Sequence, residues 1–184
     1  MKKRKGIILA GGTGSRLMPM TGLLSKQVLP VYDKPMIYYP LSVLMLARIT
    51  EILVISSPEH LPQLRETVLR LGNLGIEFKF ISQPRPEGIA QALILGEDFL
   101  DGSPCALILG DNIFFGHGFS ETLQNADENR SSAQIFVHQV NKPEQYGVIE
   151  LNSDGKIIGI VEKPSVPRSN LAVTGLSFFD PSAS

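Results

Sequence analysis

Short apolar runs rich in β-branched residues recur along this chain, and segments with helical periodicity separate them. Apolar runs of about four to eight residues are typical of buried strands, whereas apolar residues spaced three and four apart are typical of half-buried helices. The predicted strands cover residues 6–10, 51–56, 76–81, 106–109 and 134–140. The predicted helices cover residues 37–48, 61–71, 89–99 and 119–129.

This alternation predicts an α/β fold with a doubly wound, mostly parallel, Rossmann-like sheet, because right-handed crossovers place helices on both of its faces. After Val140 the alternation of strand and helix patterns ends. The stretch "YGVIELNSDGKIIGIVEKP" predicts two strands joined at Asp154-Gly155, and thus a β-hairpin insertion in the C-terminal third. A last strand is expected over 172–179. The length of 184 residues favours a single domain, 1–184.

Composition narrows the class of function. With 17 basic and 18 acidic residues the formal net charge is -1, which gives no global field for attracting nucleic acid or an anionic membrane. The longest apolar run, 36–47, is shorter than the roughly 20 residues that span a bilayer. The basic residues at 2–5 precede an apolar stretch too short for a secretory signal. We therefore expect a soluble, cytoplasmic protein with no nucleic-acid or membrane partner.

The single cysteine, Cys105, lies in the apolar run "CALIL" and has no partner for an intrachain disulfide. A buried, inert thiol is expected there rather than a catalytic nucleophile. The histidines His60, His117 and His138 show no metal-ligand spacing, so no chemistry is assigned to them.

The first predicted strand runs into glycines in "GIILAGGTGSRL". Because Gly11, Gly12 and Gly14 lack side chains, their backbone N–H groups can approach phosphate oxygens. The pattern is not a P-loop, and Leu17 stands where a dinucleotide fingerprint has its third glycine. An anion-binding loop and an ordinary tight turn both remain open.

Charged residues follow the ends of two predicted strands. Arg16 ends the glycine stretch and Lys26 lies in "TGLLSKQVLP", so both cations are candidates for a triphosphate and its leaving pyrophosphate, or are solvated surface charges. Asp111, in "ALILGDNIFFG", comes directly after a buried run at the carboxyl edge of the sheet. It is a candidate ligand for Mg²⁺, the alternative being a helix or turn cap.

Two further stretches contain side chains that could bind a nucleobase, a sugar or a phosphate. In "SQPRPEGIAQAL", Gln83 offers a donor and an acceptor to a base edge and Gly88 opens a helix, although the stretch taken alone favours a rigid strand-to-helix connection. In "GIVEKP", Glu162 can accept from sugar hydroxyls and Lys163 can meet a phosphate, the alternative being a solvated pair.

Taken in order, "GIILAGGTGSRLMPMTGLLSKQVLPVYDKPMIYYPLS", "QPRPEGIAQA", "LGDNIFFGH", "YGVIE", "EKP" and "AVTGLSFFD" closely resemble the glucose-1-phosphate thymidylyltransferases, which are sugar nucleotidyltransferases also called dTDP-glucose pyrophosphorylases. The resemblance implies a nucleotide-diphospho-sugar transferase fold. It also implies condensation of dTTP with glucose 1-phosphate to dTDP-glucose and pyrophosphate, for dTDP-rhamnose and deoxysugar biosynthesis, in a homo-oligomer that uses Mg²⁺.

The same resemblance implies roles for individual residues. Arg16, Lys26, Asp111 and Lys163 would be catalytic, with Asp111 also the metal ligand. The nucleotide would contact Gly11, Gly12, Gly14, Gln83 and Gly88. The sugar phosphate would contact Gly147, Glu162, Lys163 and Val173.

Members of this family extend beyond the position at which the present sequence stops, and the resemblance implies a second metal-binding aspartate in that region. Two alternatives therefore stay open. One is a C-terminally truncated homologue that binds nucleotide or sugar phosphate without turnover. The other is a uridylyltransferase of the same fold.

Overall fold

The computed structural model describes residues 2–12, 14–128 and 133–181. These residues form two compact units, one of residues 1–134 and 178–184 and one of residues 135–177. We call them unit 1 and unit 2. No helix in the described residues is both long and apolar enough to cross a membrane.

Unit 1 is built on the strands β1 (Lys5–Leu9), β4 (Glu51–Ser56), β5 (Glu77–Ser82) and β6 (Cys105–Leu109). They lie in the order β5-β4-β1-β6, and all three pairs are parallel. In the sheet order β6 is followed by β10 (Leu171–Phe179), whose last two residues, Phe178 and Phe179, belong to unit 1. The predicted doubly wound parallel sheet is confirmed.

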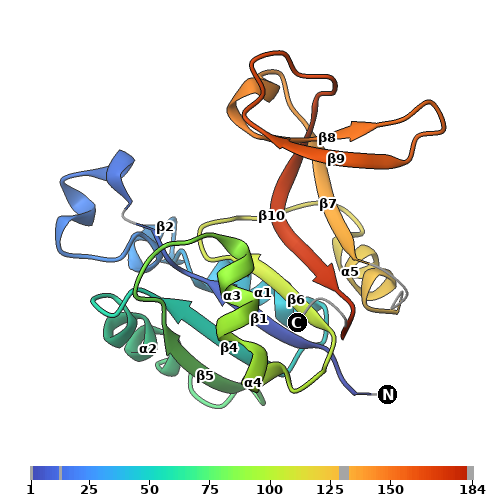
Figure 1. The fold of residues 1–184 in the computed structure, drawn as a ribbon. Helices are drawn as coiled ribbons and strands as arrows, with labels where there is room; N and C mark the ends of the chain where they lie inside the picture. The colour runs from blue at the N-terminus through green and yellow to red at the C-terminus, as the bar shows by residue number, and fades with distance from the viewer. Residues whose placement is uncertain (1, 13, 129–132, 182–184) are drawn as a thin grey trace. The chain divides into compact units, whose positions relative to one another are not determined.

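Helices cover both faces of this sheet (Figure 1). On one face α3 (Ile89–Leu95) and α4 (Glu97–Leu100) pack on a core that includes Ile7, Leu53 and Leu107. On the other face lies α1 (Tyr38–Leu46), while α2 (Leu61–Leu69) packs against β5. Alternate residues of β1 and β4 are thus buried on opposite faces, as a sheet covered on both sides requires. The remaining helix, α5 (Phe119–Glu128), contacts α1.

Two local features differ from the sequence-based expectation. The helix predicted over 89–99 is divided into α3 and α4 at Gly96, which has low helix propensity. Between β1 and α1 the chain also forms three 3₁₀ helices and a small hairpin that periodicity did not predict. These are η1 (Ser15–Leu17), η2 (Met20–Gly22), η3 (Lys26–Val28), β2 (Pro30–Val31) and β3 (Lys34–Pro35).

Unit 2 contains the strands β7 (Gln134–Gln139), β8 (Gly147–Leu151), β9 (Ile157–Glu162) and most of β10, with the 3₁₀ helix η4 (Pro143–Gln145) before β8. The order is β9-β8-β10-β7, and β8 pairs antiparallel with both β9 and β10. The predicted hairpin is therefore present. Its loop is wider than a two-residue turn: the Asn152 side-chain oxygen accepts from the N–H groups of Asp154 and Lys156, and only Gly155 has positive φ.

Arg4 directly precedes β1 and, from a buried position, ties that strand to three other elements of unit 1. Its Nε donates to Asp127 Oδ1 on α5 at 2.7 Å, and its NH1 donates to the carbonyls of Cys105 and Phe179 at 2.9 and 2.8 Å. The guanidinium also stacks over the Phe178 ring, 4.9 Å from the centroid. The basic residues at 2–5 thus include a structural arginine that joins β1, β6, α5 and the end of β10.

We expect Arg4→Met to lower the free energy of unfolding by about 3 kcal/mol, because it leaves a carboxylate and two carbonyls short of a buried donor. Urea denaturation followed by circular dichroism measures this change. Lys3→Met, at an exposed neighbouring position, is the control and should change stability by less than about 0.5 kcal/mol. Equal midpoints for the two variants would contradict the structural role of Arg4.

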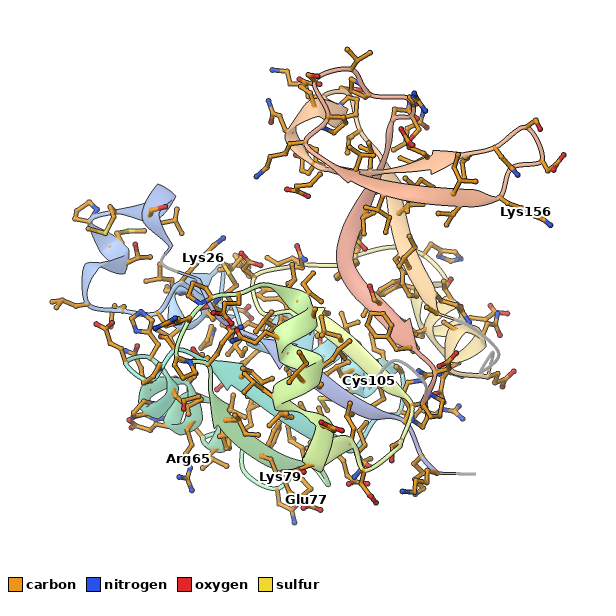
Figure 2. The ribbon with its side chains drawn as sticks, viewed as in Figure 1. Lys26, Arg65, Glu77, Lys79, Cys105 and Lys156 are labelled. Atoms are coloured by element: carbon orange, nitrogen blue, oxygen red, sulfur yellow. The ribbon has the colours of Figure 1, made fainter. Side chains whose placement is uncertain are left out.

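Cys105 lies within β6 in the core of unit 1 (Figure 2). Burial raises the pKa of its thiol to about 12, and the positive charge of Arg4 opposes this only in part. The buried thiol expected from the sequence is confirmed.

Because the thiol stays protonated well above neutral pH, we expect an aromatic disulfide reagent at pH 8 to label Cys105 at least about 100-fold more slowly in the folded chain than in guanidinium. Absorbance of the released thiolate measures both rates. Rapid stoichiometric labelling of the folded chain would contradict the assignment.

Candidate functional site

We call Ala10, Gly11, Gly12 and Gly14 the glycine loop; it begins directly after β1 ends, at the carboxyl edge of the parallel sheet. Gly14 has a φ of 59°, and a Cβ on it would lie 2.8 Å from Thr21 Cγ2. A Cβ on Gly11 would lie 2.9 Å from Gln83 Oε1. The loop is therefore packed closely against its neighbours, and at both positions a side chain would displace them.

Side chains from three different segments hold the loop by its carbonyl oxygens. Ser56 Oγ donates to Ala10 O at 2.9 Å, Gln27 Nε2 donates to Gly11 O at 3.4 Å, and Thr21 Oγ1 donates to Gly14 O at 2.8 Å. Among the described residues, the N–H groups of Gly11, Gly12 and Gly14 meet no protein acceptor. The loop is thus fixed through its acceptors while its donors stay available for an anion.

A pocket of about 240 Å³ lies against this loop; we call it the loop pocket. Its lining residues are Gly11, Gly12, Gly14, Ser15, Leu17, Lys26, Gln27 and Asp111. The predicted cation Lys26 and the predicted metal ligand Asp111 therefore share one pocket with the glycines. Figure 2 labels Lys26 in unit 1. Arg16 lies in η1, but its side chain is outside the described part of the chain.

Lys26 and Asp111 are each other's partner in this pocket. Lys26 Nζ lies 2.9 Å from Asp111 Oδ2, and the two side chains are 29% and 36% exposed. Lys26 begins η3, whose cap Ser25 accepts from the Gln27 N–H, and Asp111 lies two residues beyond β6. The pair brings one positive and one negative charge to the same point of the sheet edge.

A second, smaller pocket of about 130 Å³ shares Gly11 and Gly12 with the first; we call it the Gln83 pocket. Its other lining residues are Ser57, Glu59, His60, Gln83, Pro84 and Pro86. Gln83 follows β5 and is 4% exposed, and its N–H donates to Ser56 O at 2.7 Å. Gly88 has positive φ at the start of α3 but does not line this pocket.

In unit 2 the predicted sugar-phosphate residues come from three adjacent strands. Gly147 of β8 pairs with Glu162 of β9, and a Cβ on Gly147 would lie 2.9 Å from Glu162 Oε2. On the other side of β8, Val148 pairs with Ala172, so the antiparallel register brings Val173 beside Gly147. Lys163 directly follows β9 and has positive φ, and its Nζ lies 3.4 Å from Glu162 Oε1.

Several residues that hold the glycine loop or line its pockets were not predicted. Thr21 and Gln27 hold the loop but lie in segments whose sequence pattern gives no sign of that contact, and Ser56 at the end of β4 also holds it. Ser57 Oγ is the one buried side-chain polar atom in the described residues that lacks a hydrogen-bond partner, and Ser57 lines the Gln83 pocket. The signal available in the sequence was position, because Ser56 and Ser57 stand at the exit of a buried strand.

Among the described residues, no three His, Cys, Asp or Glu side chains gather in a way that could hold a metal ion by themselves. Asp111 is the one acidic residue in the described lining of the loop pocket. A single carboxylate fits Mg²⁺ when phosphate oxygens of a substrate supply further ligands.

Comparison with known proteins agrees with this geometry. The glucose-1-phosphate thymidylyltransferase of Xanthomonas campestris pv. campestris (strain B100) is 56% identical over 185 residues, which cover 100% of this chain and 62% of that protein. The chain thus spans less than two thirds of that relative's length.

Solved structures share the fold. A Bacillus anthracis protein provisionally assigned as a glucose-1-phosphate thymidylyltransferase, crystallised with sucrose, superposes with a TM-score of 0.87 at 39% identity. The match covers 97% of this chain and 72% of that one. A UDP-glucose pyrophosphorylase bound to UDP-glucose gives a TM-score of 0.83 at 26% identity, with coverage of 98% and 77%.

A family model described as nucleotidyl transferase matches residues 5–184, which include the glycine loop, both pockets and the strands β8, β9 and β10. The chain therefore belongs to the nucleotidyl transferase family.

Proposed function

We propose that this chain binds dTTP and glucose 1-phosphate and transfers the thymidylyl group, giving dTDP-glucose and pyrophosphate for deoxysugar biosynthesis. The observation that carries the proposal is the loop pocket. There, a lysine, a carboxylate and N–H groups that have no acceptor among the described residues line one cavity, beside a second pocket with a buried amide. The thymidylyltransferase named above, 56% identical, supports dTTP as the nucleotide.

In this proposal the triphosphate lies along the glycine loop, where Gly11, Gly12 and Gly14 donate to its oxygens. Lys26 and Arg16 neutralise its negative charge. For Lys26 to do so, its 2.9 Å pair with Asp111 must open, so that the ammonium turns to phosphate and the carboxylate is released. Gln83 and Gly88 contact the base.

Asp111 would hold Mg²⁺ together with phosphate oxygens of the nucleotide. When bound, the ion would neutralise charge on the triphosphate and on the departing pyrophosphate.

The sugar phosphate contacts Gly147, Glu162, Lys163 and Val173 in this proposal. One of its phosphate oxygens attacks the α-phosphorus in line, a new P–O bond forms, and the bond to the β-phosphate bridge breaks as pyrophosphate leaves. The attacking oxygen is already anionic and needs no dedicated base, so positioning and charge neutralisation provide the catalysis. A homo-oligomer is proposed as the working form, on the family resemblance alone.

Two other activities are compatible with the same pockets. Binding without turnover is one, and transfer of a uridylyl group is the other, since the chain shares its fold with a UDP-glucose pyrophosphorylase. Pyrophosphate release with dTTP or with UTP, each with glucose 1-phosphate and Mg²⁺, separates the three. We expect turnover with a preference for dTTP.

We expect Asp111→Asn to lower kcat/KM for dTTP by about 100-fold or more, because the variant loses the charge that pairs with Lys26 and would bind the metal. The pyrophosphate-release assay measures it. Asp154→Asn, in the exposed hairpin loop of unit 2, is the matched control and should behave as wild type. Unchanged turnover in Asp111→Asn would reject its catalytic role.

Gly14→Ala tests the loop directly. We expect it to weaken dTTP binding at least about tenfold, because the new Cβ, 2.8 Å from Thr21 Cγ2, displaces the loop whose N–H groups face the phosphates. Calorimetric titration measures the affinity. Gly72→Ala also introduces alanine at positive φ, 71°, but with no atom within 4 Å of the new Cβ. This control should lower stability by about 1 kcal/mol and leave affinity intact.

A further inference from the structure

Three side chains between the end of β5 and the first turn of α3 form a hydrogen-bonded series that leads into the Gln83 pocket. Gln83 Nε2 donates to Gln91 Oε1 at 2.5 Å, and Gln91 Nε2 donates to Glu87 Oε2 at 2.7 Å. The backbone N–H of Glu87 also donates to Gln91 Oε1, at 3.2 Å. Gln91 lies on the first turn of α3, and Glu87 precedes the helix by two residues.

Chemistry allows only one orientation of the Gln91 amide in this series. An ionised carboxylate can only accept, so the group facing Glu87 Oε2 must be the NH₂ of Gln91. A backbone N–H can only donate, so the group facing it must be the oxygen of Gln91. Turning the amide over would break both contacts at once. Glu87 therefore fixes Gln91 twice, once through its side chain and once through its backbone.

The fixed oxygen of Gln91 in turn fixes Gln83. Since Gln91 Oε1 is an acceptor, Gln83 must turn its NH₂ toward it, and its own Oε1 then points away. That oxygen lies 2.9 Å from the position of a Cβ on Gly11, beside the glycine loop. Gln83 is 4% exposed and lines the pocket that shares Gly11 and Gly12 with the loop pocket. Its side chain thus presents an acceptor next to the loop.

An acceptor in this position distinguishes between pyrimidines. Thymine and uracil carry a hydrogen on ring nitrogen N3 and can donate to Gln83 Oε1, whereas N3 of cytosine is itself an acceptor and would oppose it. A site built to bind a donor discriminates strongly against an analogue that lacks it, because its buried acceptor then stays unpaired. If the Gln83 amide were free to rotate, it could present its oxygen to N3–H of thymine or its NH₂ to N3 of cytosine, and so could bind either base.

We propose that Gln91, held by Glu87, is a positioning residue that locks the Gln83 amide and so makes the pocket select an imide pyrimidine over cytosine. The inference rests on the proposed function, in which the Gln83 pocket receives the base.

The test compares dissociation constants for dTTP and dCTP, measured by calorimetry on the full 184-residue chain in one Mg²⁺ buffer. We expect the wild type to prefer dTTP, and Gln91→Leu to lower that preference about tenfold, with dCTP gaining relative to dTTP because the freed amide can turn its NH₂ to cytosine N3. A purely structural defect would weaken the binding of both nucleotides alike and leave the ratio of their dissociation constants unchanged.

Two further variants sharpen the result. The double variant Glu87→Gln, Gln91→Glu swaps the two side chains. The carboxylate at position 91 still accepts from Gln83, and the amide at position 87 donates to that carboxylate, so the variant should retain the wild-type ratio of the dTTP and dCTP dissociation constants. Gln124→Leu makes the same chemical change on α5, outside both pockets, and should also retain the ratio. Should circular dichroism show that Gln91→Leu is unfolded, Gln91→Met, which is closer in shape, replaces it with the same expectation.

The outcomes separate the two proposals. Selective dTTP binding by the wild type, with the same ratio in the Gln91 variant, would overturn the role of Gln91 and leave the proposed function standing. Equal binding of dTTP and dCTP by the wild type would also overturn the role of Gln91, since the pocket would then have no preference for Gln91 to enforce, and would leave nucleotide binding by the chain standing. Absence of binding to either nucleotide would overturn both.

Discussion

The parallel pairing of β1 with β4 on one side and β6 on the other is the constraint on which the rest of unit 1 depends. Leu9, the last residue of β1, pairs with both Ile55 and Leu109, and Ser56 at the end of β4 pairs with Ser82 at the end of β5. This register makes the strands end together at one edge. The segments that leave this edge carry the glycine loop, Gln83 and Asp111. One set of backbone hydrogen bonds thus gathers the phosphate-binding, base-binding and metal-binding candidates of unit 1.

Buried hydroxyl and amide groups then fix the conformation of the glycine loop at this edge. A glycine loop by itself is flexible, and binding would have to overcome the entropy of ordering it. Here Thr21, Gln27 and Ser56 hold the loop carbonyls before any ligand arrives, so part of that cost belongs to folding rather than to binding. The Gln83 amide is likewise restrained before a ligand arrives, because it donates to Gln91, whose own amide is held by Glu87.

The sequence was informative wherever a short-range pattern sufficed. Apolar periodicity predicted the sheet, its parallel pairing and the two layers of helices, and strand exits pointed to Gly11, Asp111 and Gln83. The sequence was uninformative where contacts between residues far apart in the chain determine the structure. The β2–β3 hairpin and the pairing of Lys26 with Asp111, 85 positions apart, have no local signal. The division of α3 from α4 had one, the low helix propensity of Gly96, but apolar periodicity alone missed it. The residues that hold the loop are ordinary polar residues until the fold brings them to it.

The ion pair between Lys26 and Asp111 also bears on how an anionic ligand reaches the protein. Opposite charges 2.9 Å apart form a dipole whose field fades quickly with distance, and the chain as a whole carries a formal net charge of only -1. Long-range electrostatic steering from this pair is therefore weak, and the association rate should depend little on ionic strength. In the proposed function, discrimination would begin at contact, when the incoming phosphate competes with the Asp111 carboxylate for the Lys26 ammonium group.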